Sequence, residues 1–228
     1  MPESLTPAAS EPLTFHALRD GLGPLRPGPS VVDPEGVQRG RLIVAMVDAV
    51  AERGYGATTI GDVVALAKVS RRTFYECFAD KEACFLAAYD AATDIMLQAI
   101  GESFRTAGPW EQRLLAGVDA YLHGLAREPA VSRVFLLEVL SAGPRALAHR
   151  REVLGRFAAQ LRELVDLGRA EYPEIAPLTE SMALAIVGGV NELVLAAVEE
   201  DRVGELPLLQ RSAADFVRAV VAAAPTSD

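Results

Sequence analysis

The 228-residue chain has little of the chemistry that marks enzymes and metal proteins. It contains two cysteines, three histidines and one tryptophan, and aromatic residues make up only 6% of it. It shows no glycine-rich phosphate loop, cysteine–histidine cluster or nucleophile motif, so we expect no enzyme, no metal and no cofactor. A catalytic triad assembled in space around Ser132 or Ser141 is the alternative that the sequence leaves open.

Cysteine spacing and hydrophobic run lengths exclude two further classes of protein. Cys77 and Cys84 lie seven positions apart, a pattern typical of two small buried residues rather than a disulfide framework. No run approaches about 18 uninterrupted apolar residues. The first residues lack the charged start and apolar core of a signal peptide. We therefore expect a cytoplasmic protein without membrane contact.

Positive charge is also scarce, and the net charge of −9 is unevenly spread. Residues 33–81 hold seven basic and seven acidic side chains, whereas residues from 82 onward hold 13 basic and 21 acidic ones. The segment 33–81 is thus neutral, so bulk positive charge cannot provide it with affinity for a polyanion such as nucleic acid. Its non-specific affinity should be low, because that affinity comes from neutralised phosphates.

The residues that dominate the chain, Ala, Leu, Val, Glu and Arg, favour helix, and no strand-like alternation occurs. We predict an all-α protein of about nine helices. Apolar spacing and capping residues place them at 33–53, 60–66, 71–78, 81–108, 110–127, 129–140, 145–170, 179–200 and 206–223. Residues 1–32, rich in Pro and Gly, are expected to form a disordered arm. Its Arg19 and Arg26 either reach a minor groove or stay solvated.

Two of the predicted helices form a helix-turn-helix. The first, 60–66, carries Val63 and Val64 on an inward face, and the tight connection 67–69 follows. Ser70 then caps a second helix that begins with Arg71 and Arg72. In such a unit the second helix lies in the major groove with its N-terminal residues at the base edges.

Residues 39–89 resemble the TetR family of repressors. The resemblance rests on a glycine–aromatic stop, a paired threonine, a short apolar helix, a Val-Ser turn, a Thr-Phe-Tyr run, a Phe and a Lys-Glu pair: Gly54 to Thr59, 60–67, Val69 to Tyr75, Phe78, Lys81 and Glu82. It implies a helix-turn-helix domain at 33–80 and a helical ligand-binding and dimerisation domain at 81–228. It also implies a partner, an operator in double-stranded DNA.

The resemblance assigns roles to individual residues of the helix-turn-helix. Thr59 would cap the first helix and bond a phosphate, and Tyr75 and Lys81 would bond phosphates. Arg71, Arg72 and Thr73, following the cap Ser70, would face the groove and read bases; for Tyr75 a partly buried core position is the alternative. Two residues depart from the family pattern: Arg72 replaces a small residue, and Cys77 replaces a histidine or aromatic. The operator sequence is therefore not transferable.

Beyond residue 89 the resemblance is weak, and the expectations rest on side-chain character. An inducer pocket should lie among the fourth to eighth helices. Its candidate residues are Trp110, Tyr121, Phe135, Glu138, Met182 and Asn191, with His123, His149 and Glu192 as further polar groups. Each of these, taken singly, is equally compatible with ordinary core or surface. Glu138 stands out because a carboxylate within an apolar run is costly to bury unpaired.

The last two helices carry the predicted dimer interface. Gly188 and Gly189 cost about 1 kcal/mol each in a helix interior relative to Ala, which indicates the close approach of another helix. The predicted interface residues are Met182, Ile186, Gly189, Leu193, Phe216 and Val220; packing within one chain is the alternative. We thus predict a dimeric repressor that binds an inverted repeat and is released by a small-molecule inducer. The rival is a helical ligand carrier or interaction protein whose DNA-binding head does not function.

Overall fold

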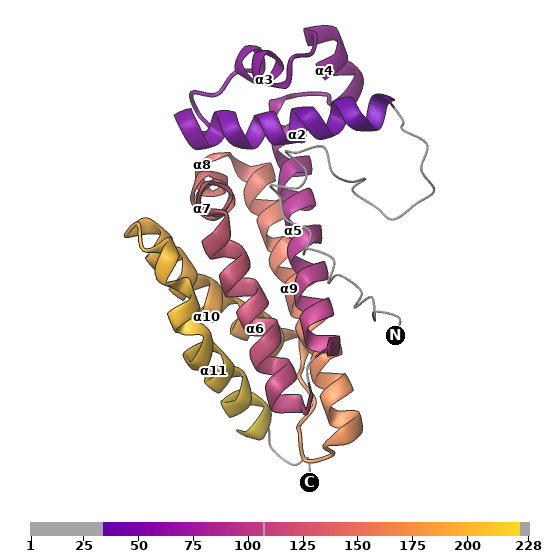
Figure 1. The fold of residues 1–228 in the computed structure, drawn as a ribbon, viewed down its shortest axis with the longest axis vertical. Coiled ribbons are helices and arrows are strands. Elements are labelled where there is room, and N and C mark those ends of the chain that lie inside the picture. Colours follow the sequence, from indigo (N-terminus) through magenta and orange to yellow (C-terminus); the bar gives the residue numbers. More distant parts are fainter. Residues whose placement is uncertain (1–33, 107, 224–228) are drawn as a thin grey trace, which may run out of the picture.

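A computed structural model of the chain describes residues 34–106 and 108–223, and the regular structure within them is entirely helical (Figure 1). The predicted all-α class is therefore confirmed. The predicted arm 1–32, with Arg19 and Arg26, and the predicted cap Asp33 lie outside the described residues. Every predicted helix has a counterpart, and most ends agree within a few residues.

The first three helices form a head that sits across one end of the molecule (Figure 1). They are α2 (Pro34–Arg53), α3 (Ile60–Ala67) and α4 (Arg71–Cys77). Helix α2 buries an apolar stripe, with Leu42 and Met46 completely inaccessible, against α3, α4 and the start of the next helix. Apolar residues three and four positions apart make that stripe, as the sequence predicted.

The remaining helices form an elongated body below the head (Figure 1). They are α5 (Lys81–Thr106), α6 (Trp110–Arg127), α7 (Pro129–Arg133), α8 (Val139–Ser141), α9 (Pro144–Glu171), α10 (Glu180–Glu199) and α11 (Gln210–Ala223). Helices α5 and α6 pack along each other, and α9 packs on α5 and α10. The core of the head continues without a break into the upper body through Phe85, Phe135 and Val153.

Two predicted α-helices contain other helical geometry. The segment predicted at 129–140 includes the π-helical turn η1 (Val134–Glu138), and the helix predicted from residue 206 starts with the 3₁₀ segment η2 (Val203–Leu209). Pro207 explains the second difference, because proline lacks the donor that an α-helix interior needs. Apolar periodicity alone distinguished neither segment from an α-helix.

Two helices are long and apolar enough, by length and composition, to cross a membrane: residues 81–105 and 180–199. Both pack within the body: α5 lies against α6 and α9, and α10 lies against α9. Their apolar residues also line an internal cavity, which is described below.

Candidate DNA-binding surface and ligand cavity

The start of α3 is held by a capping box. The Thr59 side chain accepts a hydrogen bond from the Asp62 backbone N–H at 3.2 Å, and the Asp62 carboxylate accepts one from the Thr59 backbone N–H at 2.9 Å. The Thr59 side-chain and backbone hydrogen bonds lower the pKa of the Asp62 carboxyl below its usual value. The predicted cap at Thr59 is therefore confirmed, and its hydroxyl remains at the surface.

A short, well-defined turn sets the angle between α3 and α4. Lys68 ends α3 in the left-handed conformation, with φ 54°, and its backbone N–H bonds back into the helix. Ser70 then caps α4, because its Oγ accepts a hydrogen bond from the Thr73 N–H at 3.0 Å. Phe74 of α4 is completely buried, and its ring anchors this helix to the rest of the head.

One side of α4 presents polar groups to solvent. Arg71 and Arg72 are exposed at its first turn, and Tyr75, one turn further, is 56% exposed. The alternative of a buried Tyr75 is therefore wrong. The Arg72 guanidinium, 89% exposed, pairs with Glu76 at 2.9 Å, an ion pair that DNA phosphates or bases can replace. These side chains thus form an exposed polar side of α4.

Lys81 has a structural function that the sequence did not reveal. Its Nζ donates hydrogen bonds to the carbonyl oxygens of Tyr55 at 2.8 Å and Thr58 at 2.9 Å, and lies 4.1 Å from the Tyr55 ring centre. Partial burial lowers the pKa of this ammonium. Lys81 therefore fixes the loop before α3 to the start of α5.

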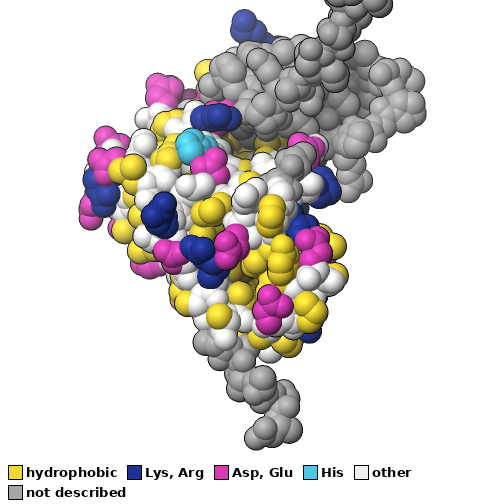
Figure 2. Space-filling view, turned by 60° about the horizontal axis from the view of Figure 1, so that its bottom comes forward, with side chains coloured by type: hydrophobic (Ala, Val, Ile, Leu, Met, Phe, Trp, Pro, Cys, Tyr) yellow, Lys and Arg dark blue, Asp and Glu magenta, His cyan; other side chains and the backbone are white. Residues whose placement is uncertain are grey.

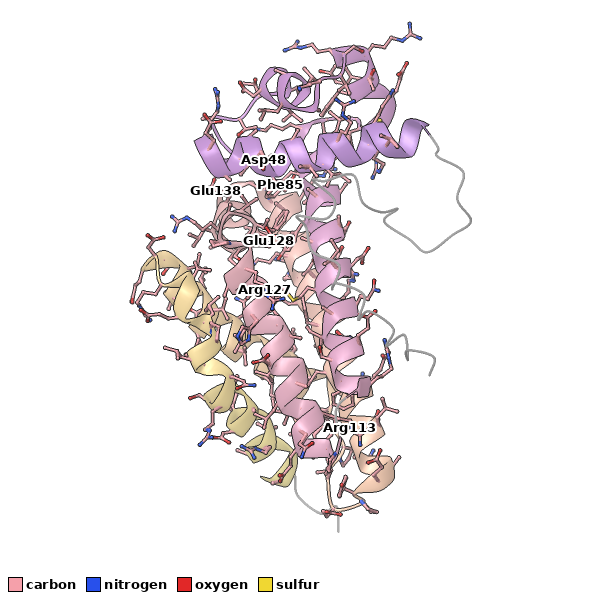
Figure 3. The ribbon with its side chains drawn as sticks, viewed as in Figure 1. Asp48, Phe85, Arg113, Arg127, Glu128 and Glu138 are labelled. Carbon is pink, nitrogen blue, oxygen red and sulfur yellow. The ribbon has the colours of Figure 1, made fainter. Side chains whose placement is uncertain are left out.

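Glu138 connects the head to the body. Its carboxylate accepts a hydrogen bond from the Tyr55 backbone N–H at 2.7 Å, in the loop between α2 and α3. The neighbouring Gly54 has φ 78°, and a Cβ added there would lie 3.3 Å from Glu138 Oε2. Figure 3 shows Glu138 and Phe85 directly below α2. Glu138 does not line the cavity, which corrects the expectation that it would. Its hydrogen bond to the Tyr55 N–H instead explains how a carboxylate is accommodated within an apolar run.

Arg145 adds a second polar connection, between α9 and the start of α5. Its guanidinium lies 3.3 Å from the Asp80 carboxylate and 3.0 Å from that of Glu82. The Asp80 carboxylate also caps α5 by accepting the Ala83 N–H at 2.7 Å, and this hydrogen bond is the main reason that the pKa of Asp80 is lowered. Polar contacts of Glu138, Lys81 and Arg145 thus join the head to the body.

An apolar cavity of about 250 Å³ runs inside the body. Helices α5, α6, α7, α9, α10 and α11 and the turn η1 contribute its walls, so its lining extends to the ninth predicted helix as well. At its upper end Phe135 stacks on Tyr89 with ring centres 4.9 Å apart, and at its lower end Trp110 meets Phe104 edge-on at 5.9 Å. A cavity of this lining suits a largely apolar ligand.

Four of the six predicted pocket residues line this cavity, namely Trp110, Tyr121, Phe135 and Asn191. Glu138 and Met182 do not; Met182 instead packs against the core of the lower body. The additional candidates lie elsewhere: His149 bonds Asp90 at 3.0 Å, His123 pairs with Asp119, and Glu192 is exposed.

The cavity contains a few polar groups that the sequence did not single out. Gln160 donates through Nε2 to the Leu97 carbonyl at 2.7 Å, whereas its buried Oε1 has no partner. Asn191 is 6% exposed and makes no side-chain hydrogen bond within the described residues. Burial raises the pKa of Tyr121 well above its usual value, so this phenol stays neutral. Only polar residues recurring on otherwise apolar helix faces could have indicated these positions.

Helix α10 has two apolar faces, where the sequence suggested one. Ile186 is buried and, with Val190, lines the cavity, whereas Leu193 and Gly189 are on the outer surface. A Cβ added at Gly189 would lie 3.2 Å from Phe216 Cε1 of α11, and Phe216 is 41% exposed. Of the predicted dimer residues, Gly189, Leu193 and Phe216 thus form an outer surface. Ile186, Met182 and Val220 instead pack inward within the chain, and Leu184 and Ala185 are exposed beside the first three.

The lower end of the body does not resemble a DNA-binding surface. Figure 2 shows this end with acidic side chains scattered among hydrophobic and basic ones. That mixture agrees with the net negative charge of the residues after 82. Residues 33–81 hold equal numbers of basic and acidic side chains, so the head repels a polyanion less than the body does.

Comparison with known proteins connects these features to one family. Residues 42–88, which span most of the head and the start of α5, match the family described as "Bacterial regulatory proteins, tetR family". Over 88 residues the chain is 30% identical to the HTH-type transcriptional activator FasR of Mycolicibacterium smegmatis. That alignment covers 39% of this chain, and the chain spans only 40% of the length of that relative.

Solved structures extend the likeness of the fold to the body. The transcriptional regulator FadR of Bacillus subtilis, in complex with stearoyl-CoA, is 20% identical with a TM-score of 0.68, covering 78% of this chain and 96% of its own. The fatty acid degradation regulator FadR of Bacillus halodurans is 22% identical with a TM-score of 0.71, covering 82% and 96%. At such identities these structures establish a shared fold.

Proposed function

We propose that this chain, whose residues 42–88 match the tetR family of bacterial regulatory proteins, is a ligand-responsive transcriptional repressor of that family acting as a homodimer. One observation carries the proposal most directly. Helix α4 is capped by Ser70, supported by the buried Phe74, and exposes Arg71, Arg72 and Tyr75 on one side. A short capped helix with arginines at its first turn is the geometry that reads bases in the major groove.

The same observation argues against the rival, a ligand carrier with a non-functional head. A head without selection for DNA binding has no physical need for two exposed arginines and a 56% exposed tyrosine around one capped helix. Arg71 and Arg72 would contact base edges or phosphates, and Thr59 and Tyr75 would contact phosphates. Thr73, half-buried with its Oγ1 2.9 Å from Ser70 Oγ, would contribute at the groove edge.

A dimer would place two such heads on one operator. The outer face of α10 and α11 carries Gly189, Leu193 and Phe216, which are exposed although apolar or small. A second copy of this surface is its proposed occupant, since a two-fold pair presents two recognition helices to half-sites about 34–36 Å apart. The operator is then an inverted repeat.

The cavity is the proposed inducer site. An apolar ligand there would contact Phe135 of η1, and η1 also contains Glu138, which bonds the loop before α3. A ligand that binds more tightly when η1 is displaced would thereby shift the population toward heads that no longer fit the operator. We propose a long fatty acyl group as the ligand, supported by the cavity's apolar lining and by the stearoyl-CoA bound to the Bacillus subtilis FadR.

Activation of transcription is the second candidate, because the Mycolicibacterium smegmatis relative is named an activator. The two directions differ in where the operator lies relative to the promoter. A reporter fused to the chain's operator decides between them: deletion of the gene raises expression under repression and lowers it under activation. We place this regulator in the cytoplasm, where it meets both DNA and acyl metabolites.

The proposal is tested by selecting DNA from a random-sequence library with the purified full chain. The expected product is an inverted repeat whose half-sites lie about one helical turn apart, bound by two chains and released by raised salt. Recovery of no common sequence would overturn the repressor and leave the ligand-carrier alternative. Light scattering at micromolar concentration tests the dimer, and a monomeric mass would contradict it.

A further inference from the structure

The one tryptophan of the chain lines the cavity near the lower end of the body. Trp110 is the first residue of α6, is 6% exposed, and lines the cavity together with Phe104 and Leu114. Its ring lies directly on the backbone of α9 at Gly168, where an added Cβ would come within 2.7 Å of Trp110 Cζ3. Gly168 is buried, and because it has no side chain the Trp110 ring can lie against the backbone of α9.

Charge is present in the cavity lining at one place only. Arg127 and Glu128, at the corner between α6 and α7, are the charged residues among those that line it, and Arg127 is exposed. Figure 3 shows both well above Arg113, which lies near the opposite end of α6. Arg113 is not part of the lining, and its guanidinium already pairs with the Glu171 carboxylate at 2.5 Å.

The two ends are far enough apart for an extended acyl chain. Trp110 and Arg127 lie 17 positions apart on one helix, which corresponds to about 25 Å along its axis. One layer of lipid chains fills about half of the roughly 30 Å hydrocarbon core of a membrane. Gly124 of α6 and Met96 both line the cavity. A Cβ at Gly124 would lie 2.8 Å from Met96 Cε, so there is no room for a side chain at this position.

We propose that Trp110, seated on Gly168, is the floor of the cavity and sets the length of the acyl chain that the protein accepts. The terminal methyl lies against the indole, and the anionic end lies at Arg127. The inference rests on the proposed acyl ligand and adds its orientation and its length-determining residues. A free carboxylate and a phosphate-bearing thioester both supply the anionic end, so the experiment includes both.

The single tryptophan makes the orientation measurable. Bromine quenches indole fluorescence on contact, so stearic acid brominated near its methyl end should quench Trp110 strongly. Stearic acid brominated at its middle should quench weakly. Stronger quenching by the mid-chain bromine, or none from either ligand while calorimetry shows binding, would overturn the orientation. If no fatty acid and no acyl-CoA binds the wild-type chain, the proposed ligand class itself fails.

Variants at the floor test the length rule. We expect Trp110→Ala to move the tightest-binding chain in a C8–C22 series toward longer chains, and Gly168→Ala to move it toward shorter ones by pushing the ring into the cavity. Each methylene of the acyl chain that no longer fits inside the cavity should weaken binding about fourfold, which corresponds to about 0.8 kcal/mol. Gly155→Ala is the matched control on α9, because a Cβ there meets nothing within 4 Å.

Further variants and a check of the fold distinguish a change in ligand binding from misfolding. Trp110→Phe, which keeps a smaller ring at the floor, should shift the optimum less than Trp110→Ala, and circular dichroism checks that each variant stays helical. Arg127→Gln should weaken binding of stearate and stearoyl-CoA but not of the neutral methyl ester, whereas the exposed Arg151→Gln should weaken none of them. An unchanged length optimum in every folded floor variant overturns the length rule while leaving the regulator intact.

Discussion

The head and the body use opposite kinds of chemistry. In the head, side-chain caps at Thr59 and Ser70 fix two short helices, and charged groups stand outside on α4. In the body, long helices surround an apolar cavity that has few polar groups in its lining. DNA recognition requires exposed donors held rigidly, whereas binding of an apolar ligand requires enclosed space. The two regions meet at Glu138, Lys81 and Arg145, where polar contacts join them.

The largest effect is expected from a substitution on the outer face of α10. It changes only the body, yet it should greatly weaken DNA binding by an unchanged head. Leu193→Asp places a charge in the proposed dimer surface, 48% exposed in one chain. We expect a monomer whose operator affinity falls at least about 100-fold, because a single head reads only one half-site. Light scattering and mobility shift measure this, with the exposed Leu208→Asp as a control. A dimeric L193D with normal affinity would refute the interface.

Changes within the head should separate base reading from phosphate contact. Arg71→Ala should cost about 1–3 kcal/mol on the preferred operator and relax base preference at one position of each half-site. Tyr75→Phe should weaken all DNA sequences alike. Binding of a set of single-base operator variants distinguishes the two. If both variants produce the same pattern across that set, the division of roles on α4 is wrong.

The junction should carry the ligand's effect to the head. Glu138→Leu leaves the Tyr55 N–H without its acceptor and should reduce the change in DNA affinity caused by the ligand by about tenfold, within the usual range of coupling energies. Ligand affinity should hardly change, because Glu138 does not line the cavity. Glu138→Gln keeps an oxygen acceptor and should retain most of the coupling. Anisotropy of labelled operator, with and without ligand, measures both variants, and full coupling in E138L would contradict this function.

The smallest expected effect lies in the caps of the head. Thr59→Ala removes the side-chain half of the capping box and should lower the free energy of unfolding by about 1 kcal/mol. Thr59→Ser keeps the hydroxyl and should restore most of that stability. Urea unfolding followed by circular dichroism measures both variants. Equal stability of T59A and wild type would show that the box does not contribute.

Local signals made the head predictable, whereas the body depends on contacts that are distant in sequence. Thr59, Ser70 and Asp80 cap helices a few residues away, so their roles follow from short spacing. The acceptor of the Tyr55 N–H, Glu138, is 83 residues away, and Gly168 lies under Trp110 from a different helix. Spacing within one helix cannot show such pairs.

The two apolar faces of α10 were not separable from the sequence for a related reason. Its apolar residues repeat with helical spacing on two faces, so the pattern alone does not say which face is inside. The structure places Ile186 toward the cavity and Leu193 toward solvent. Only the positions of α9 and α11 decide between them, and those depend on the whole body.

Occupancy of the cavity should change the affinity of the head for DNA. The most direct test titrates the full chain onto a fluorescent copy of its selected inverted repeat at fixed salt, with and without saturating stearoyl-CoA. The ligand should raise the Kd for this DNA at least about fivefold, the lower limit of a coupling of about 1–3 kcal/mol. An unchanged Kd, with calorimetry showing stearoyl-CoA bound to the same protein, would contradict it.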